Sequence, residues 1–229
     1  MKSLLSVLVI LTVFNNLSFC QLPRVLFNTK YGGSGAEEFT GVTQLTNGNY
    51  VMGGDESSTD YECVGNHGEE DFFLTCVAPK GQLLWQKVIG GSQSDGGRYN
   101  INTSKVHSTA DGGFFFGGST KSNDGDMSGN HGGWDAFIMK CDADGNIKWK
   151  KLYGGNNYEY FGDMQSTPDG GCLFVVGSSS GTNGDVPANH STGTSDVWLV
   201  KLDPLGNIQW SKMYGGTGTD NPTSLNLLT

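Results

Sequence analysis

The chain has 229 residues, of which 36 are glycine and 6 are proline, and it carries a formal charge of −9 at neutral pH. Abundant glycine, together with a hydrophobic share of 36%, excludes a disordered chain and is typical of turn-rich β structure with a buried core. The acidic balance argues against nucleic acid as a partner, because phosphate groups repel negative charge.

Residues 1–20 have the layout of a secretory signal peptide. Lys2 is followed by an apolar run from Leu4 to Phe14 and then by small or polar residues. The run is too short to cross a membrane as a helix, so we expect a mature chain from Gln21 with no transmembrane segment. Cys20 also permits a lipoprotein anchor, although the bulky Phe19 before it disfavours acylation. The sequence thus predicts a protein that is secreted or held at the outer-membrane surface.

A short motif that ends in two glycines recurs along the chain and reveals an internal repeat. The copies are Trp85–Gly91, Trp149–Gly155 and Trp210–Gly216, with a degraded copy at Phe27–Gly33. Their last glycines lie about sixty residues apart, which defines the repeat unit. The units cover approximately residues 34–91, 92–155 and 156–216, and the remaining residues, 22–33 and 217–229, are expected to form partial strands.

Four short strands can be recognised in each unit from alternating hydrophobic residues and turn signals. In the third unit they cover residues 160–167, 172–179, 196–203 and 208–216. Asp-Gly and Gly-Asn pairs fall between the strands, where tight hairpins need positive backbone angles. Each unit is therefore predicted to be a four-stranded antiparallel meander.

The repeated meanders predict an all-β fold, an incomplete β-propeller of about three four-stranded blades with partial strands at both ends. One meander cannot bury both faces of its sheet, so the units must pack on one another. A linear stack of units and separate sandwiches are the alternatives. Propellers typically close with at least four blades. We therefore expect residues 21–229 to be a fragment of a longer protein, to close by forming oligomers, or to form an open arc.

Four cysteines follow the signal peptide, at positions 63, 76, 141 and 172. They occupy non-equivalent places in the repeat and show no metal-binding spacing, which favours free or buried thiols. Since export permits disulfides, a bridge between Cys63 and Cys76, which belong to one unit, is the alternative.

An acidic loop between the second and third strands recurs in all three units. It is best preserved in the second and third, where the polar residues are Asp124, Asp126, Asn130 and Asp135, and Asn183, Asp185, Asn189 and Asp196. Alternating carboxylates near glycine are how short loops bind calcium, so these eight residues are candidate calcium ligands. The alternatives are that the side chains cap their own backbone in Asx turns, or that they contact a ligand directly.

One aromatic residue departs from the repeat. Trp85, Trp149 and Trp210 are equivalent and are expected to pack between blades, whereas Trp134 lies alone in the acidic loop of the second unit. Trp134 is therefore the aromatic residue predicted to contact a ligand. No catalytic constellation is recognisable: Ser179 within GSSSG lacks a following helix, and Glu37 and Glu38 are interpreted as a solvated corner.

The stretch DGGFFFGGSTKSNDGDMSGNHGGWDAFIMKCDADGNIKWKKLYGG, residues 111–155, resembles the tandem repeats of secreted Bacteroidetes proteins and, more loosely, the bacterial β-propeller repeat (SBBP-like) family. The resemblance covers residues 27–229 and implies export as cargo of the type IX secretion system. It implies no shared reaction.

These observations predict a non-enzymatic binding, adhesion or display module that meets a protein or a glycan at the cell surface, with calcium as the one cofactor considered. A polysaccharide-active hydrolase and a structural spacer in a larger exported protein are the alternatives.

Overall fold

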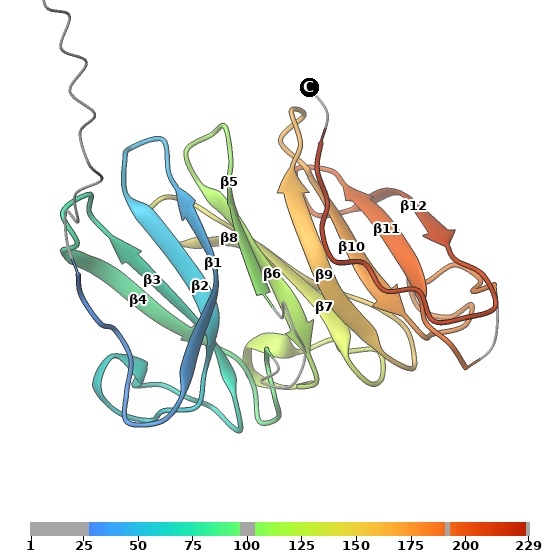
Figure 1. Cartoon of the computed structure of the whole chain (residues 1–229), viewed down its shortest axis with the longest axis horizontal. Coiled ribbons are helices and arrows are strands. Elements are labelled where there is room, and N and C mark those ends of the chain that lie inside the picture. The colour runs from blue at the N-terminus through green and yellow to red at the C-terminus, as the bar shows by residue number, and fades with distance from the viewer. Residues whose placement is uncertain (1–27, 97–103, 191–192, 228–229) are drawn as a thin grey trace, which may run out of the picture.

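The protein is all-β, as the sequence predicts. The computed structural model describes residues 28–96, 104–190 and 193–227, and in this part of the chain it contains three four-stranded antiparallel sheets (Figure 1). The predicted signal peptide, residues 1–20, lies outside the described residues. Within the described part, no helix is both long and apolar enough to span a membrane.

Each sheet is one sequence repeat, and its strands pair in chain order. The first sheet contains β1 (Glu37–Gln44), β2 (Tyr50–Glu56), β3 (Asp71–Val77) and β4 (Leu83–Ile89). The second contains β5 (Ser104–Ser108), β6 (Phe114–Thr120), β7 (Asp135–Cys141) and β8 (Ile147–Tyr153). The third contains β9 (Glu159–Ser166), β10 (Cys172–Ser178), β11 (Asp196–Leu202) and β12 (Ile208–Tyr214). One-turn 3-10 helices, η1 (Tyr61–Cys63) and η2 (Gly125–Met127), lie in the first two acidic loops.

The three sheets stand side by side as blades. Their first strands are adjacent, since β1 packs against β5 and β5 against β9 (Figure 1). The hairpin turns within the blades project at one end of the strands, and the acidic loops project at the other (Figure 1). This arrangement is that of an incomplete β-propeller.

The hydrophobic cores lie between blades. The alternation along β6 shows why: Phe114 and Phe116 belong to the core shared with the first blade, while Phe115 belongs to the core shared with the third. Phe72 of the first blade lies 5.2 Å from Phe116, centroid to centroid. Because both faces of the middle sheet are covered, β6 and β7 are buried along their whole length.

The equivalent tryptophans hold one blade to the next. Trp85 Nε1 donates a hydrogen bond to the carbonyl of Ala143 (3.3 Å), and Trp149 Nε1 donates to that of Pro204 (2.9 Å). Each acceptor lies in a hairpin turn of the following blade. Trp210, at the same place in the third blade, is 43% exposed. Trp85 and Trp149 therefore pack between blades as predicted. Trp210 does not, because no described segment covers the outer face of β12.

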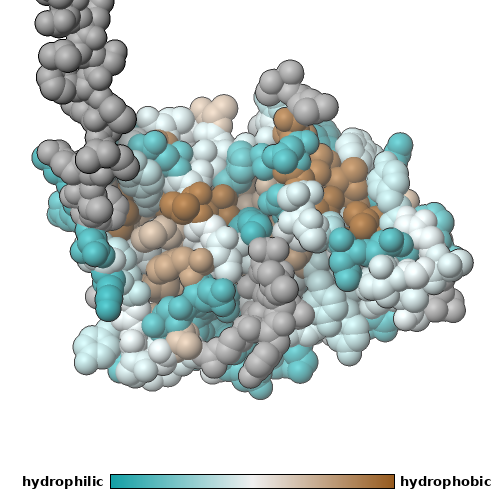
Figure 2. Space-filling model, in the orientation of Figure 1, coloured by the Kyte–Doolittle hydropathy of each residue, from teal (hydrophilic) through white to brown (hydrophobic). Residues whose placement is uncertain are grey.

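Both chain ends continue the blade pattern without forming strands in the described residues. Tyr31 donates its hydroxyl to the carbonyl of Gly81 (2.7 Å), as Tyr153 does to that of Gly206 (2.7 Å). At the other end, Leu225 donates its N–H to Asp163 of β9 (2.8 Å). The described parts of the predicted partial strands, residues 28–33 and 217–227, are therefore not strands, since no neighbouring strand pairs with them, although they contact the first and third blades. Figure 2 shows apolar patches on the face in view, one over the C-terminal third of the chain and another over the first blade.

The four cysteines are free and buried, so the alternative of a bridge between Cys63 and Cys76 is wrong. Cys63 ends η1 in the acidic loop, whereas Cys76 lies near the far end of β3. Burial raises the pKa of the Cys63 thiol to about 12 and that of Cys76 to about 11, which keeps both protonated.

Candidate functional site

The acidic loops clamp the corner that joins one blade to the next. Asp124, just before η2, accepts the backbone N–H of Ser92 (2.7 Å), and this bond lowers the pKa of the exposed Asp124 carboxyl. Asn183 accepts the N–H of Asn156 in the same way (2.6 Å). The first polar residue of each loop is thus engaged by the preceding blade's corner.

The second acid of each loop contacts the same corner. Asp126 and Asp185 donate their backbone N–H groups to the carbonyls of Gly90 (2.9 Å) and Gly154 (3.0 Å). The side chain of Asp126 forms an ion pair with Lys150, whereas the Asp185 carboxylate accepts a long bond, 3.4 Å, from Gly154 N–H.

The remaining predicted ligands hold their own loops. Asn130 and Asn189 donate from Nδ2 to the carbonyls of Thr120 (3.2 Å) and Ser178 (3.1 Å). Asp135 and Asp196, which begin β7 and β11, accept the backbone N–H of the loop histidine through Oδ2 and also contact its ring Nδ1. The distances to Nδ1 are 2.6 Å for His131 and 3.0 Å for His190.

The eight predicted calcium ligands are therefore held by separate partners. Among the described residues, the group of three or more His, Cys, Asp or Glu side chains with ligand atoms within 4.8 Å of one another is Glu37, Glu56 and Cys63, in the first blade. Asn130, Asp135 and Asp196 accept backbone N–H groups of their own loops, as the capping alternative expects, whereas Asp124 and Asn183 accept those of the preceding corner. Calcium binding by the loops stays a prediction.

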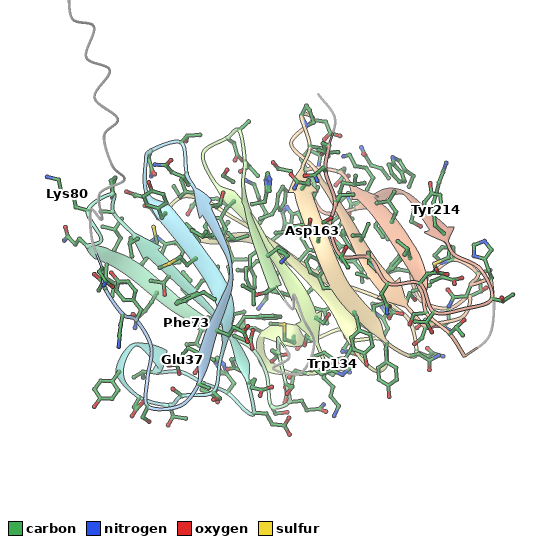
Figure 3. All side chains as sticks on the ribbon, viewed as in Figure 1. Glu37, Phe73, Lys80, Trp134, Asp163 and Tyr214 are labelled. Carbon is green, nitrogen blue, oxygen red and sulfur yellow. The ribbon has the colours of Figure 1, made fainter. Side chains whose placement is uncertain are left out.

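Trp134 lies where the second and third blades meet (Figure 3). Two tyrosines of the third blade lie beside it. Its ring centroid lies 6.4 Å from that of Tyr160, and the Tyr158 and Tyr160 rings stack at 5.8 Å with 10° between their planes. Tyr158 is 47% exposed, and Trp134 and Tyr160 are half-buried. The three rings form an aromatic cluster that solvent reaches.

The backbone fixes this aromatic cluster. Trp134 and Tyr158 form a parallel bridge, and Glu159 donates its N–H to the Trp134 carbonyl (2.6 Å). A Cβ on Gly133 would lie 2.8 Å from the Tyr158 ring, so the absence of a side chain at Gly133 lets the ring pack against the loop.

The aromatic cluster occurs at one junction. The same backbone bond runs from Asp95 to Glu70 (2.6 Å) and from Asp220 to Ser195 (2.7 Å), so Glu70 and Ser195 occupy the position of Trp134. In the corners, Ser94 and Thr219 occupy the position of Tyr158. Sequence reasoning missed Tyr158 and Tyr160; aligning the blade corners, where both break the repeat, would have indicated them.

Glu56, at the end of β2, is a buried acid of the first blade. It is 1% exposed and occupies the position of Thr120 and Ser178 in the other blades. Its Oε1 accepts a hydrogen bond from Asn66 (3.3 Å), while Oε2 has no partner among the described residues. Burial, with a smaller repulsion from Asp71, raises the pKa of Glu56 to about 7.

This raised pKa predicts a stability that falls with pH. The folded chain keeps the Glu56 proton up to about pH 7, whereas the unfolded chain releases it above its ordinary pKa of 4.5, so stability declines between these values. We expect Glu56→Gln to raise the free energy of unfolding at pH 8 by about 2 kcal/mol and to flatten this decline. Urea unfolding at pH 5.5 and pH 8 measures the gain in stability at pH 8 and the change in stability between the two pH values. Glu38→Gln, at an exposed position, is the control. A loss of stability at pH 8 in Glu56→Gln would contradict the assignment.

Comparisons with known proteins give distant likenesses. No family model matches the chain, and no curated protein matches it. Two variants of a Synechocystis apocarotenoid oxygenase each share 16% identity with it over 74% of this chain and 36% of theirs, with TM-scores of 0.37 and 0.38. A Bacteroides caccae protein of unknown function shares 14% identity over 82% of this chain and 71% of its own, with a TM-score of 0.34. The chain therefore spans about a third of the length of the oxygenases, and these likenesses transfer no activity to it.

Proposed function

We propose that this protein is a non-catalytic repeat module of an exported protein that binds a glycan through the aromatic cluster of Trp134, Tyr158 and Tyr160. The main observation in support is that the three aromatic rings lie together at one junction of an otherwise repeating structure. Residues that serve the scaffold recur in each blade, whereas a binding site needs its residues at one place.

The chemistry of the aromatic cluster suits a sugar. Aromatic rings present large flat apolar faces, and tyrosine and tryptophan add a polar edge. The faces of pyranose rings are apolar, and their rims are hydroxyls. The exposed Asn156 and Asn157 flank the cluster and offer amide groups to such hydroxyls.

Export and display are part of this proposal. The signal-like residues 1–20 and the resemblance to secreted Bacteroidetes repeats, including type IX secretion cargo, support a secreted or surface-held protein. Calcium bound by the acidic loops would stiffen the same face; Asp126→Ala and Asp185→Ala should then remove the stabilisation that calcium gives through the loops.

The binding proposal is tested with a glycan array followed by calorimetry on the strongest ligand. We expect Trp134→Ala and Tyr158→Ala each to weaken binding at least about tenfold, because losing about 1.4 kcal/mol of contact with a large aromatic face reduces the affinity by that factor. Tyr214→Ala, which removes a tyrosine that is 50% exposed on β12, should leave the affinity unchanged.

Two outcomes would overturn the proposal. Release of reducing ends from a bound polysaccharide would identify a hydrolase. Binding of surface proteins that persists in Trp134→Ala, with no glycan bound, would move the binding site elsewhere.

A further inference from the structure

Two acidic side chains from different segments meet at each junction between blades. The first begins the third strand of a blade, and the second follows five residues after the first glycine of the next corner. The pairs are Asp71 with Asp95, Asp135 with Glu159, and Asp196 with Asp220. In each pair, both carboxylates point at one glycine: a Cβ on Gly90 or Gly154 would lie 2.8 Å from Asp95 Oδ2 or 2.6 Å from Glu159 Oε2, and closer still to the other acid.

The first acid of each pair has an oxygen without a hydrogen-bond partner. Asp71, Asp135 and Asp196 are fully buried, and their Oδ1 atoms are unpartnered among the described residues. Their Oδ2 atoms are occupied by the loop histidines. A buried carboxylate oxygen with no partner costs free energy, and here the same atom is unpartnered three times.

The second acid accepts hydrogen bonds from hydroxyl and backbone N–H groups. Asp95 accepts hydrogen bonds from the Thr120 hydroxyl, from Ser122 Oγ (3.0 Å) and from Gly91 N–H (2.6 Å). At the next junction Glu159 accepts them from Ser178 Oγ (2.7 Å) and Gly155 N–H (2.8 Å).

Acidic groups predominate at these two junctions. The ionisable groups that influence Asp71 are His67, Glu56, Asp95 and Asp126, and those that influence Asp135 are His131, Glu159 and Asp185. Burial, with repulsion from Asp71, raises the pKa of Asp95 to about 6.

We infer that the two inner junctions each bind one hard divalent cation of the calcium class. The unpartnered Oδ1 of Asp71 or Asp135 and the carboxylate of Asp95 or Glu159 are the anchoring ligands. Carboxylate and hydroxyl oxygens are the donors such ions prefer, and two carboxylates match a charge of +2. This site shares Asp135 with the predicted loop site of the second blade, but it differs from the loop sites because half of it comes from the next blade and it does not use Asp124 or Asp126. It is also independent of glycan binding.

The test measures calcium bound to the purified full chain at pH 7.5 by equilibrium dialysis, and thermal unfolding in calcium and in chelator. We expect calcium to raise the Tm of the wild-type chain by about 5 °C. Asp95→Asn and Glu159→Gln should each bind one ion fewer, and the double variant two fewer. Asp144→Asn makes the same charge change at an exposed turn on the opposite face and should keep the full number.

Three results would overturn the inference. First, the wild-type chain could bind no calcium and show the same Tm in calcium and in chelator. Because this chain carries no substitution, misfolding of a variant would not explain that result. Asp126→Ala and Asp185→Ala could remove the ions while Asp95→Asn and Glu159→Gln keep them, which would place calcium in the loops. Lastly, a chain that binds no calcium but gains stability from pH 7.5 to 5.5, with the gain lost in Asp95→Asn, would hold a shared proton between each pair.

Discussion

Replacing Trp149 by alanine is expected to lower the free energy of unfolding by about 3 kcal/mol, whereas Trp210→Ala should change it by less than about 1 kcal/mol. The two residues are equivalent in sequence, so this difference isolates the contribution of the following blade. A cavity left by a large aromatic side chain is costly only where neighbours surround it.

The surroundings of Trp149 explain the size of the effect. A Cβ on Gly206 would lie 2.9 Å from the indole, so the ring fills the space beside that turn, and Nε1 donates to Pro204. Gly206 has a φ of 76°, a backbone conformation that glycine adopts readily. The absence of a side chain at this position also leaves room for the indole. No such turn covers Trp210 among the described residues.

Urea unfolding of the wild-type chain, Trp149→Ala and Trp210→Ala checks this prediction. The variant Trp149→Phe separates the contribution of ring packing from that of the Nε1 hydrogen bond. The phenylalanine keeps much of the packing and loses the hydrogen bond to Pro204, so we expect a loss of about 1 kcal/mol. Equal losses in Trp149→Ala and Trp210→Ala would mean that the tryptophans stabilise their own blades rather than the junctions.

Most of the fold was predictable because its determinants are local. The predicted strand at 196–203 is β11, Asp196–Leu202, and the Asp-Gly turns fall at the hairpins. Gly112 and Gly170 have φ values of 88° and 82°, as those turns require. Hydrophobic alternation and turn residues act over a few positions, so the sequence shows them directly. The state of residues 217–227 depends instead on whether a neighbouring strand is present, which no local pattern reports.

The candidate site was predictable only in part, because its residues come from different blades. Trp134 was identified since it breaks the repeat, whereas its neighbours Tyr158 and Tyr160 lie more than twenty residues further on. The acidic loops were recognised, but their partners in the preceding corner were not. Asp95 and Glu159 follow a fixed spacing after the corner glycines, a signal that was present in the sequence and was not used.

Gly154→Ala is expected to destabilise the protein by about 3 kcal/mol, while Gly216→Ala, in the last corner, should change stability by less than about 0.5 kcal/mol. A Cβ on Gly154 would meet Glu159 Oε2 at 2.6 Å and the Asp135 carboxylate closer still, whereas a Cβ on Gly216 meets no atom within 4 Å. Neither glycine has a positive φ, so backbone strain does not distinguish them.

The clash cannot be relieved cheaply, because hydrogen bonds hold both carboxylates. Glu159 is bonded to Gly155 N–H and Ser178, and Asp135 is bonded to His131. The Tm of each glycine variant, measured in chelator, tests the prediction without any contribution from calcium. Asp135→Ala, which removes the nearer carboxylate, then serves as a second substitution: if crowding causes the loss, Gly154→Ala should cost much less in a chain that already carries Asp135→Ala. If the two losses simply add, the glycine is required for some reason other than the room it leaves for the paired acids.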